Sequence, residues 1–159
     1  MGKDTNHEGG CTCGQVRYRV EASPLIVHAC HCRWCQRETG SAFVINAVVE
    51  ASHVPLLQGE VELIDTPSAS GRGQKVARCP RCRVALWSHY PQAGPTVCFV
   101  RVGTLDDPSA FPPDVHIYTN SKQTWLPLPE GARAFAEFYE VPAVWPAESL
   151  ARMVKLRAT

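Results

Sequence analysis

The sequence predicts a single mainly-β domain, built from short strands and small helices and held together in part by metal ions. Short segments alternate apolar with polar residues or form brief apolar runs, as strands do. Clusters of Gly, Pro and Ser separate these segments, as turns do. Seven of the eight cysteines fall into two groups with the spacing of metal ligands. A chain of 159 residues is long enough to bury one hydrophobic core.

Each predicted strand rests on its local pattern. In the first, Val16, Tyr18 and Val20 alternate with polar residues, which indicates a half-buried strand with a basic outer face. The later strands are short apolar runs, and the segment 66–73, rich in Ser, Gly and Pro, is typical of a hairpin loop between two of them. In chain order the predicted strands are 16–20, 25–29, 43–49, part of 54–64, 74–78, 84–90, 96–102 and 116–119.

Three helices are expected. Residues 33–39 form the first, which ends at Gly40 because glycine readily takes the left-handed conformation that closes a helix. Residues 132–139 form the second. The third covers 147–157, with Pro146 at its start, and its acidic first turn and basic last turn suit the helix dipole.

Cys11, Cys13, Cys79 and Cys82 predict a closed metal site. They form two short clips, Cys-x-Cys and Cys-Pro-x-Cys, and four thiolates complete the tetrahedral shell that structural zinc prefers. The two clips lie far apart in the sequence. A zinc ion there would pin the N-terminal strand to the middle of the sheet, so folding and metal binding should be coupled.

Cys30, Cys32 and Cys35 predict a second metal site of a different kind. Three thiolates leave one zinc position free, and a free position on a Lewis acid can take a substrate. A helix that starts near Cys32 would place Cys32 and Cys35 on one face, and its first backbone N–H groups would stabilise thiolates there.

Two alternatives for this group stay open. A histidine can close the site as a fourth ligand, which would make it a second structural zinc site. Cys32 and Cys35 can instead form a redox pair, although such pairs usually follow a strand in a βαβ unit, and the sequence shows no such unit. The candidate fourth ligands are His28, His31, His89 and His116.

Other reactive residue types have mainly structural interpretations. Cys98 stands on an apolar strand, where a free cysteine is usually a small core residue. His89 and His116 are the best candidates for proton transfer. The chain carries no phosphate-binding loop, dinucleotide fingerprint or serine-nucleophile elbow. Three tryptophans could line a pocket, although each is more often a core residue: Trp34, Trp87 and Trp125.

The charge balance argues against nucleic acid and membranes as partners. The formal net charge is +1, and metal would bring it to about −2, since seven thiolates remove seven charges and two Zn²⁺ ions restore four. No apolar stretch approaches the roughly 18 residues of a membrane span, and the polar start is unlike a signal peptide. Clustered cysteines suit a shared metal better than disulfides. We therefore expect a cytoplasmic protein. The sequence alone does not determine whether it is a monomer or an oligomer.

Three segments carry a family resemblance: GCTCGQVRY at 10–18, CHCRWCQRETGSAF at 30–43, and CPRC at 79–82. They resemble the glutathione-dependent formaldehyde-activating enzymes, a family that includes the centromere protein V relatives. The similarity continues through 102–108 and 116–119 and covers roughly residues 9–140. The order and spacing of all seven cysteines make it specific.

The resemblance implies a β-tent fold of several small antiparallel sheets with short helices, stabilised by zinc. It implies two Zn²⁺ ions, one structural on the four-cysteine group and one catalytic on Cys30, Cys32 and Cys35. One departure concerns Arg83, where the family usually carries Gly. A zinc knuckle often needs a positive φ at that position, which Gly adopts at the least cost.

The resemblance also divides the chain. Residues 1–8 are expected to be a flexible lead-in, residues 9–140 the zinc domain, and residues 141–159 an extension that carries a helix. The extension lies outside the shared pattern, and it could cover the pocket, mediate a dimer or pack on the sheet.

These features predict a carbon–sulfur lyase-type enzyme that acts on a small thiol or thiol adduct. The family's founding reaction condenses glutathione with formaldehyde to S-(hydroxymethyl)glutathione. Three thiolates make zinc a weak Lewis acid, so thiol exchange is favoured over water activation. The alternatives are a non-catalytic zinc-binding interaction module and a methionine sulfoxide reductase-like enzyme with Cys98 as nucleophile. The apolar strand around Cys98 argues against the latter, because it would raise the pKa of that thiol.

Overall fold

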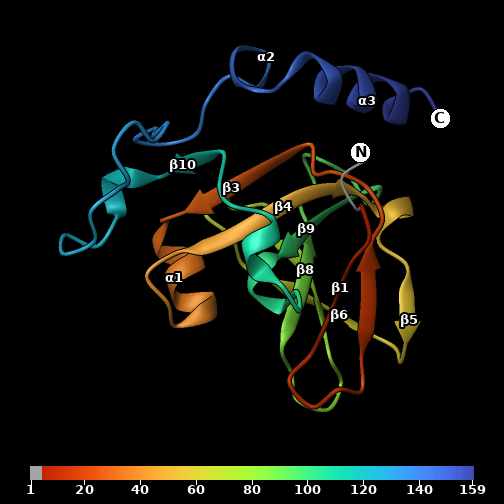
Figure 1. Ribbon diagram of the computed structural model, residues 1–159. Helices are drawn as coiled ribbons and strands as arrows, with labels where there is room; N and C mark the ends of the chain where they lie inside the picture. Colours follow the sequence, from red (N-terminus) through yellow and green to blue (C-terminus); the bar gives the residue numbers. More distant parts are fainter. Residues whose placement is uncertain (1–4) are drawn as a thin grey trace.

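The computed structural model describes residues 5–159 and shows a mainly-β protein (Figure 1). The strands are β1 (His7–Gly10), β2 (Arg17–Val20), β3 (Ile26–Cys30), β4 (Val44–Glu50), β5 (Leu56–Gln58), β6 (Glu62–Thr66), β7 (Gln74–Arg78), β8 (Ala85–His89), β9 (Val97–Arg101) and β10 (Val115–Ile117). The helices are α1 (Arg33–Thr39), α2 (Val141–Val144) and α3 (Ala147–Arg157), with short 3₁₀ turns between strands.

The strands form two sheets. The smaller sheet has the order β1-β2-β5, and the larger has the order β10-β3-β4-β9-β8-β7-β6. Every neighbouring pair is antiparallel except β10 and β3, which run parallel. The predicted mainly-β fold with small sheets and short helices is therefore confirmed, with one parallel pair inside the larger sheet.

Both faces of the larger sheet are buried at its centre. In β4, Ala47 and Val49 belong to one apolar cluster, together with residues of the smaller sheet. Val44 and Val48 belong to a second cluster on the opposite face, together with α1 and the C-terminal segment. Alternate residues of a strand point to opposite faces. Because both faces are buried here, β4 has a nearly continuous apolar sequence.

Two of the three expected helices form with the predicted bounds. α1 covers Arg33–Thr39, and Gly40 ends it in the left-handed conformation with φ +63°. α3 covers Ala147–Arg157, after Pro146. Both ends of each helix are determined by local residues, which is why the sequence placed them correctly.

The helix predicted for 132–139 is wrong. This segment is extended and runs beside β10, where His116 donates its N–H to the Arg133 carbonyl at 2.8 Å and Phe135 donates to the His116 carbonyl at 2.9 Å. Its Phe135 and Tyr139 rings pack into the second apolar cluster. Pairing with β10 satisfies the backbone groups that a helix would otherwise satisfy within itself.

The N-terminal strand begins inside the predicted lead-in. β1 pairs with β2 over His7–Gly10, so the expected boundary at residue 8 falls within a strand, and residues 1–4 lie outside the described part. Gly9 allows a close approach here, because a Cβ atom on it would lie 2.6 Å from the Thr104 carbonyl oxygen.

The C-terminal extension packs on the larger sheet (Figure 1). In α3, the Ser149 hydroxyl donates to the Leu25 carbonyl at 2.6 Å. Arg152 forms a two-pronged ion pair with Glu50 of β4, at 2.8 and 2.6 Å. Of the three roles considered for this segment, packing on the sheet is the one observed.

Candidate metal centres and the adjoining cleft

The four-cysteine group joins two turns that are distant in the sequence. Cys11 and Cys13 lie between β1 and β2, and Cys79 and Cys82 lie between β7 and β8. All four sulfurs lie within 4.8 Å of one another. The Cys11–Cys13 and Cys13–Cys79 sulfur separations are 3.5 and 3.7 Å. A tetrahedral Zn–S₄ site with bonds of about 2.3 Å requires sulfurs about 3.8 Å apart, so the group fits a metal ion.

Backbone N–H groups support these sulfurs. Val16 donates to the Cys11 sulfur at 3.3 Å, and Arg81 donates to the Cys79 sulfur at 3.4 Å. The backbone N–H of Val84, together with other donors, lowers the pKa of Cys82 to about 6. These contacts favour the thiolate form that metals bind.

Arg83 follows the second clip in the left-handed conformation, with φ +66°. Its N–H donates to the Cys79 carbonyl at 3.0 Å, which closes the turn. Its side chain forms an exposed ion pair with Glu62. The expectation of a positive φ at this position is therefore confirmed, and an arginine adopts it here.

The three-cysteine group lies at the junction of β3 and α1. Cys30 is the last residue of β3, Cys32 is the N-cap of α1, and Cys35 lies in its first turn. The three sulfurs are buried and lie within 4.8 Å of one another. Cys35 donates its backbone N–H to the Cys32 sulfur at 3.3 Å. Hydrogen bonds from the Cys30 and Cys35 thiols, with this N–H, lower the pKa of Cys32 to about 3.

None of the four candidate histidines joins this group within residues 5–159. His28 places its Nε2 against the hydroxyl of Tyr139. His31 and His116 contact each other, Nε2 to Nδ1, at 3.0 Å. His89 places its Nδ1 2.8 Å from a carbonyl of β9. Three sulfurs are therefore the ligands that the described chain offers here.

Burial favours the neutral form of both His31 and His116. Burial, with His116 nearby, lowers the pKa of His31 to about 4, and burial also lowers the pKa of His116. The Nδ1 of His31 is buried without a hydrogen-bond partner in the described chain. The redox alternative gains no support from the topology, because α1 connects antiparallel strands, β3 and β4, rather than a parallel βαβ unit.

Tyr118 packs against the apolar cluster that contains the three cysteines, interacts electrostatically with them, and has a strained backbone conformation. Its φ is +56°, which is costly for a residue with a side chain. Its N–H donates to the Glu137 carbonyl at 3.0 Å, and its carbonyl accepts from the N–H of Ser121 at 3.2 Å. The Ser121 hydroxyl and the Gln36 amide both donate to the carbonyl of His31. This network fixes Tyr118 relative to the cysteines.

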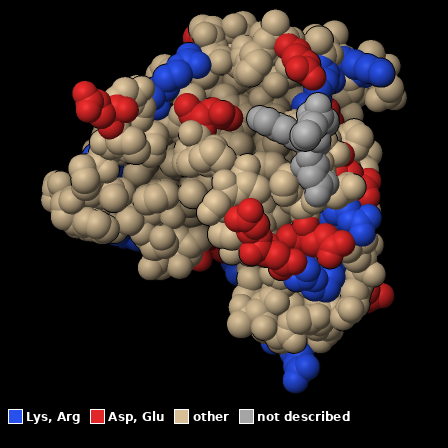
Figure 2. Space-filling view, in the orientation of Figure 1, with Lys and Arg blue, Asp and Glu red and all other residues tan. Residues whose placement is uncertain are grey.

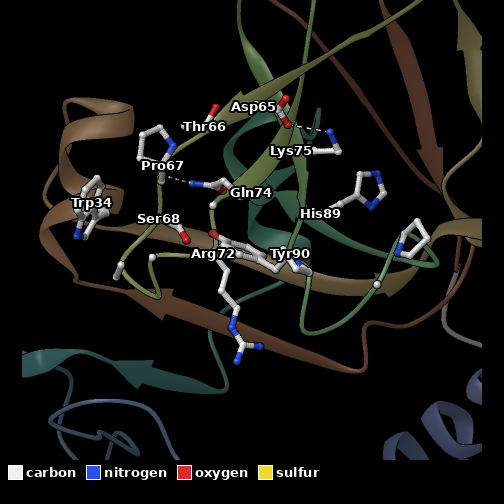
Figure 3. Close-up of a pocket in the computed structure, with 16 residues that line it drawn as sticks. Trp34, Asp65, Thr66, Pro67, Ser68, Arg72, Gln74, Lys75, His89 and Tyr90 are labelled. Atoms are coloured by element: carbon white, nitrogen blue, oxygen red, sulfur yellow. Dashed lines mark hydrogen bonds and ion pairs between the residues drawn. The ribbon is translucent and has the colours of Figure 1, made fainter.

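A large cleft opens beside α1 (Figure 3). It has a volume of about 940 Å³ and lies between Trp34, the β6–β7 loop and the loop after β8. None of the three cysteines lines the cleft, but Tyr90 does, and Tyr90 interacts electrostatically with Cys30, Cys32 and Cys35. Of the three tryptophans considered for a pocket, Trp34 lines this cleft, Trp87 is buried in the core and Trp125 is exposed.

The walls of this cleft carry a few polar groups. Gln74 donates its amide to the Pro67 carbonyl at 3.4 Å, and its Oε1 is buried without a partner in the described chain. Lys75 pairs with Asp65 at 2.7 Å, whereas Arg72 forms no ion pair within residues 5–159. The cleft therefore offers apolar surface, one buried acceptor and an excess of positive charge.

Sequence reasoning missed a buried polar layer near the cysteines. Arg101 of β9 donates to the Asn46 side-chain oxygen at 2.5 Å and to the Ser88 hydroxyl at 3.1 Å. All three residues are buried. Alternation within each strand could have placed them on one face, but their pairing depends on the sheet register.

Cys98 is a buried residue of β9, and burial raises its pKa to about 12. A thiol in that state is a poor nucleophile, which does not favour the reductase alternative.

On the face seen in Figure 2, acidic and basic side chains are interspersed among the described residues. Within residues 5–159, no helix combines the length and apolar character needed to cross a bilayer.

The fold and the two sulfur groups define a mainly-β protein with two thiolate sites able to hold metal. Comparison with known proteins identifies the family: a model described as "Glutathione-dependent formaldehyde-activating enzyme" matches residues 6–121. The chain belongs to this family, which confirms the resemblance seen in the sequence.

The comparisons also give two individual proteins that are similar to this chain. A Halomonas elongata protein named "Putative glutathione-dependent formaldehyde-activating enzyme" is 29% identical over 144 residues, covering 82% of this chain and 87% of the relative. A crystal structure of a Rhodobacter sphaeroides protein matches with a TM-score of 0.47 and 23% identity, over 62% of this chain and 87% of that one.

Proposed function

We propose that this protein is a zinc-dependent carbon–sulfur lyase-type enzyme that joins glutathione to formaldehyde, giving S-(hydroxymethyl)glutathione. In this proposal, one structural Zn²⁺ lies on Cys11, Cys13, Cys79 and Cys82. One catalytic Zn²⁺ lies on Cys30, Cys32 and Cys35. The observation that carries the proposal is a buried group of three sulfurs with no fourth ligand from the described chain, together with a large cleft whose lining residue Tyr90 interacts electrostatically with them.

Zinc bound to the three sulfurs would stabilise an incoming sulfur as its thiolate at neutral pH. The residues of the chain then provide position and exclude water. The N-terminus of α1 fixes Cys32 and Cys35, and Trp34 lines the cleft that would receive the substrate. Arg72 binds a carboxylate of the substrate in this proposal, because it lines the cleft and its charge has no ion-pair partner within residues 5–159.

The reaction needs one proton transfer for each bond formed. The substrate sulfur attacks the carbonyl carbon of formaldehyde, a C–S bond forms, and the C=O double bond becomes a single bond. The oxygen takes up the proton that the thiol lost. Burial and the neighbouring Cys30 sulfur raise the pKa of Tyr118, so its hydroxyl stays protonated and can donate a hydrogen bond to that oxygen.

The free state of the cysteines indicates the cellular compartment. All eight cysteines are free in the structure, and both groups need reduced sulfur to hold metal. Reduced cysteines persist in a reducing compartment, so we assign the protein to the cytoplasm as part of this proposal.

The direct test is catalysis of the exchange between free glutathione and its formaldehyde adduct. The zinc-loaded protein is added to an equilibrium mixture, and the exchange rate is measured by two-dimensional NMR exchange spectroscopy against the spontaneous rate. We expect an increase that disappears in the Cys32→Ser variant. An exchange rate equal to the spontaneous one, in a protein holding two zinc ions, would refute the proposed reaction.

A further inference from the structure

Arg101 is a buried cation whose described partners are all neutral. Its side chain lies in β9 and is 5% exposed. One terminal nitrogen donates to the Asn46 side-chain oxygen at 2.5 Å and the other to the Ser88 hydroxyl at 3.1 Å. Its Nε is buried without a hydrogen-bond partner, and it forms no ion pair within residues 5–159. A buried guanidinium without a counter-ion is costly, so a compensating negative charge is expected nearby.

The sheet register places Arg101 beneath the three-cysteine group. Asn46 of β4 lies directly opposite His28 of β3 on one side and opposite Arg101 on the other. Directly opposite residues share a face, and Cys30 shares it with His28 because it lies two positions further along β3. α1 packs over β4, and Arg101 interacts electrostatically with the Cys35 sulfur.

The charges around Arg101 leave the cysteines as its counter-ion. Arg78 also belongs to this region, but it is ion-paired with Glu38 of α1, so that pair is neutral. Zn²⁺ with three thiolates carries one net negative charge, and a fourth thiolate from a substrate would bring it to two. Without a cation close by, this excess charge would be poorly accommodated in a buried site.

We propose that Arg101 is the counter-charge of the three-cysteine metal site and acts as a positioning residue for it. Its positive charge stabilises the zinc–thiolate group and favours an anionic sulfur over a neutral ligand in the fourth position. Asn46 and Ser88 hold the guanidinium in place while adding no charge of their own. The inference rests on the metal-binding part of the proposed function, and it is independent of which thiol is the substrate.

The sharpest test changes the charge and the hydrogen bond separately at position 46. Asn46→Asp keeps an acceptor for Arg101 but neutralises it, so it should weaken zinc binding at the three-cysteine site by about 10- to 100-fold. Asn46→Ser shortens the side chain and removes the oxygen that accepts from Arg101, but it adds no charge. The zinc affinity of this variant should therefore stay near that of the wild type. A purely structural role for the contact predicts the reverse order, because the carboxylate would hold the arginine more firmly.

The readout is zinc affinity, measured by competition with a chromogenic chelator, with the four-cysteine zinc as internal reference. Arg101→Met should weaken the second zinc as Asn46→Asp does, and Arg101→Lys should retain most of the affinity. If Arg101→Met does not fold, Asn46→Asp still tests the proposal, because it keeps Arg101 buried and hydrogen-bonded while neutralising its charge. Wild-type affinity in Asn46→Asp would overturn this inference alone. A wild-type protein that takes up only one zinc would overturn the metal site itself.

Discussion

Cys79→Ser should unfold the protein, because the four-cysteine group joins two turns that are distant in the sequence and its metal would contribute a large share of the folding free energy. Cys79 is fully buried, and its sulfur meets that of Cys13 at 3.7 Å across 66 positions of sequence. A structural zinc contributes on the order of 10 kcal/mol, whereas a whole domain is stable by about 5–15 kcal/mol. Loss of one ligand therefore removes most of the stability that the domain has.

The assay is thermal unfolding followed by circular dichroism, with zinc content measured in parallel. Cys98→Ala is the matched control, because it also replaces a buried cysteine but one that belongs to neither sulfur group. We expect the control to remain folded with one small cavity, at a cost of about 1 kcal/mol. A soluble Cys79→Ser variant with the melting temperature of the control would refute the structural zinc.

The remaining predictions concern single residues. Cys32→Ser should lose one zinc per chain yet keep its fold, as metal analysis and circular dichroism would show; loss of both ions would contradict it. Tyr118→Phe should lower the rate of adduct exchange by about 10- to 100-fold without changing thiol affinity, whereas an unchanged rate would exclude a role for the hydroxyl. Arg72→Ala should weaken binding of glutathione by about 10-fold but leave 2-mercaptoethanol, which has no carboxylate, unaffected. Glu50→Gln should cost about 1 to 2 kcal/mol at pH 7, because it removes the charge of Glu50 from a part-buried ion pair with Arg152.

The Glu50 prediction has a defined pH dependence. Burial alone would raise the pKa of Glu50, but Arg152, the backbone N–H of Glu50 and His53 together outweigh it, so the net pKa is lowered. The ion pair therefore adds stability above the ordinary glutamate pKa of about 4.3, and this stability is lost as the pH falls through the folded value. Urea unfolding at pH 7 and pH 3 should show the difference between wild type and Glu50→Gln shrinking at the lower pH. A constant difference would contradict the assignment.

Local signals were sufficient for part of the fold. Gly40 and Pro146 determined where α1 and α3 end or begin, because capping depends on a few adjacent residues. The segment 132–139 misled the prediction, since its aromatic spacing suits a helix face. In the structure its backbone pairs with β10 instead.

Local sequence signals also predicted the cysteine groups of the candidate site, but not the residues around them. The cysteine spacing grouped all seven sulfurs, because each clip is short, and the structure brings each group within 4.8 Å. Arg101 and Asn46 could not be paired from the sequence, since they lie 55 positions apart and meet only through the β4–β9 register. Tyr118 reaches the cysteines through the parallel pairing of β10 with β3, which no local pattern shows.

The central claim is that the three-cysteine metal has a free position that accepts a thiol. The most direct measurement is the absorption spectrum of the cobalt-substituted protein during titration with glutathione. We predict that the thiolate-to-cobalt band strengthens as a fourth sulfur enters, and that Cys32→Ser, which retains the four-cysteine site, shows no such change. A spectrum that stays constant at saturating glutathione, with two cobalt ions bound, would contradict the claim.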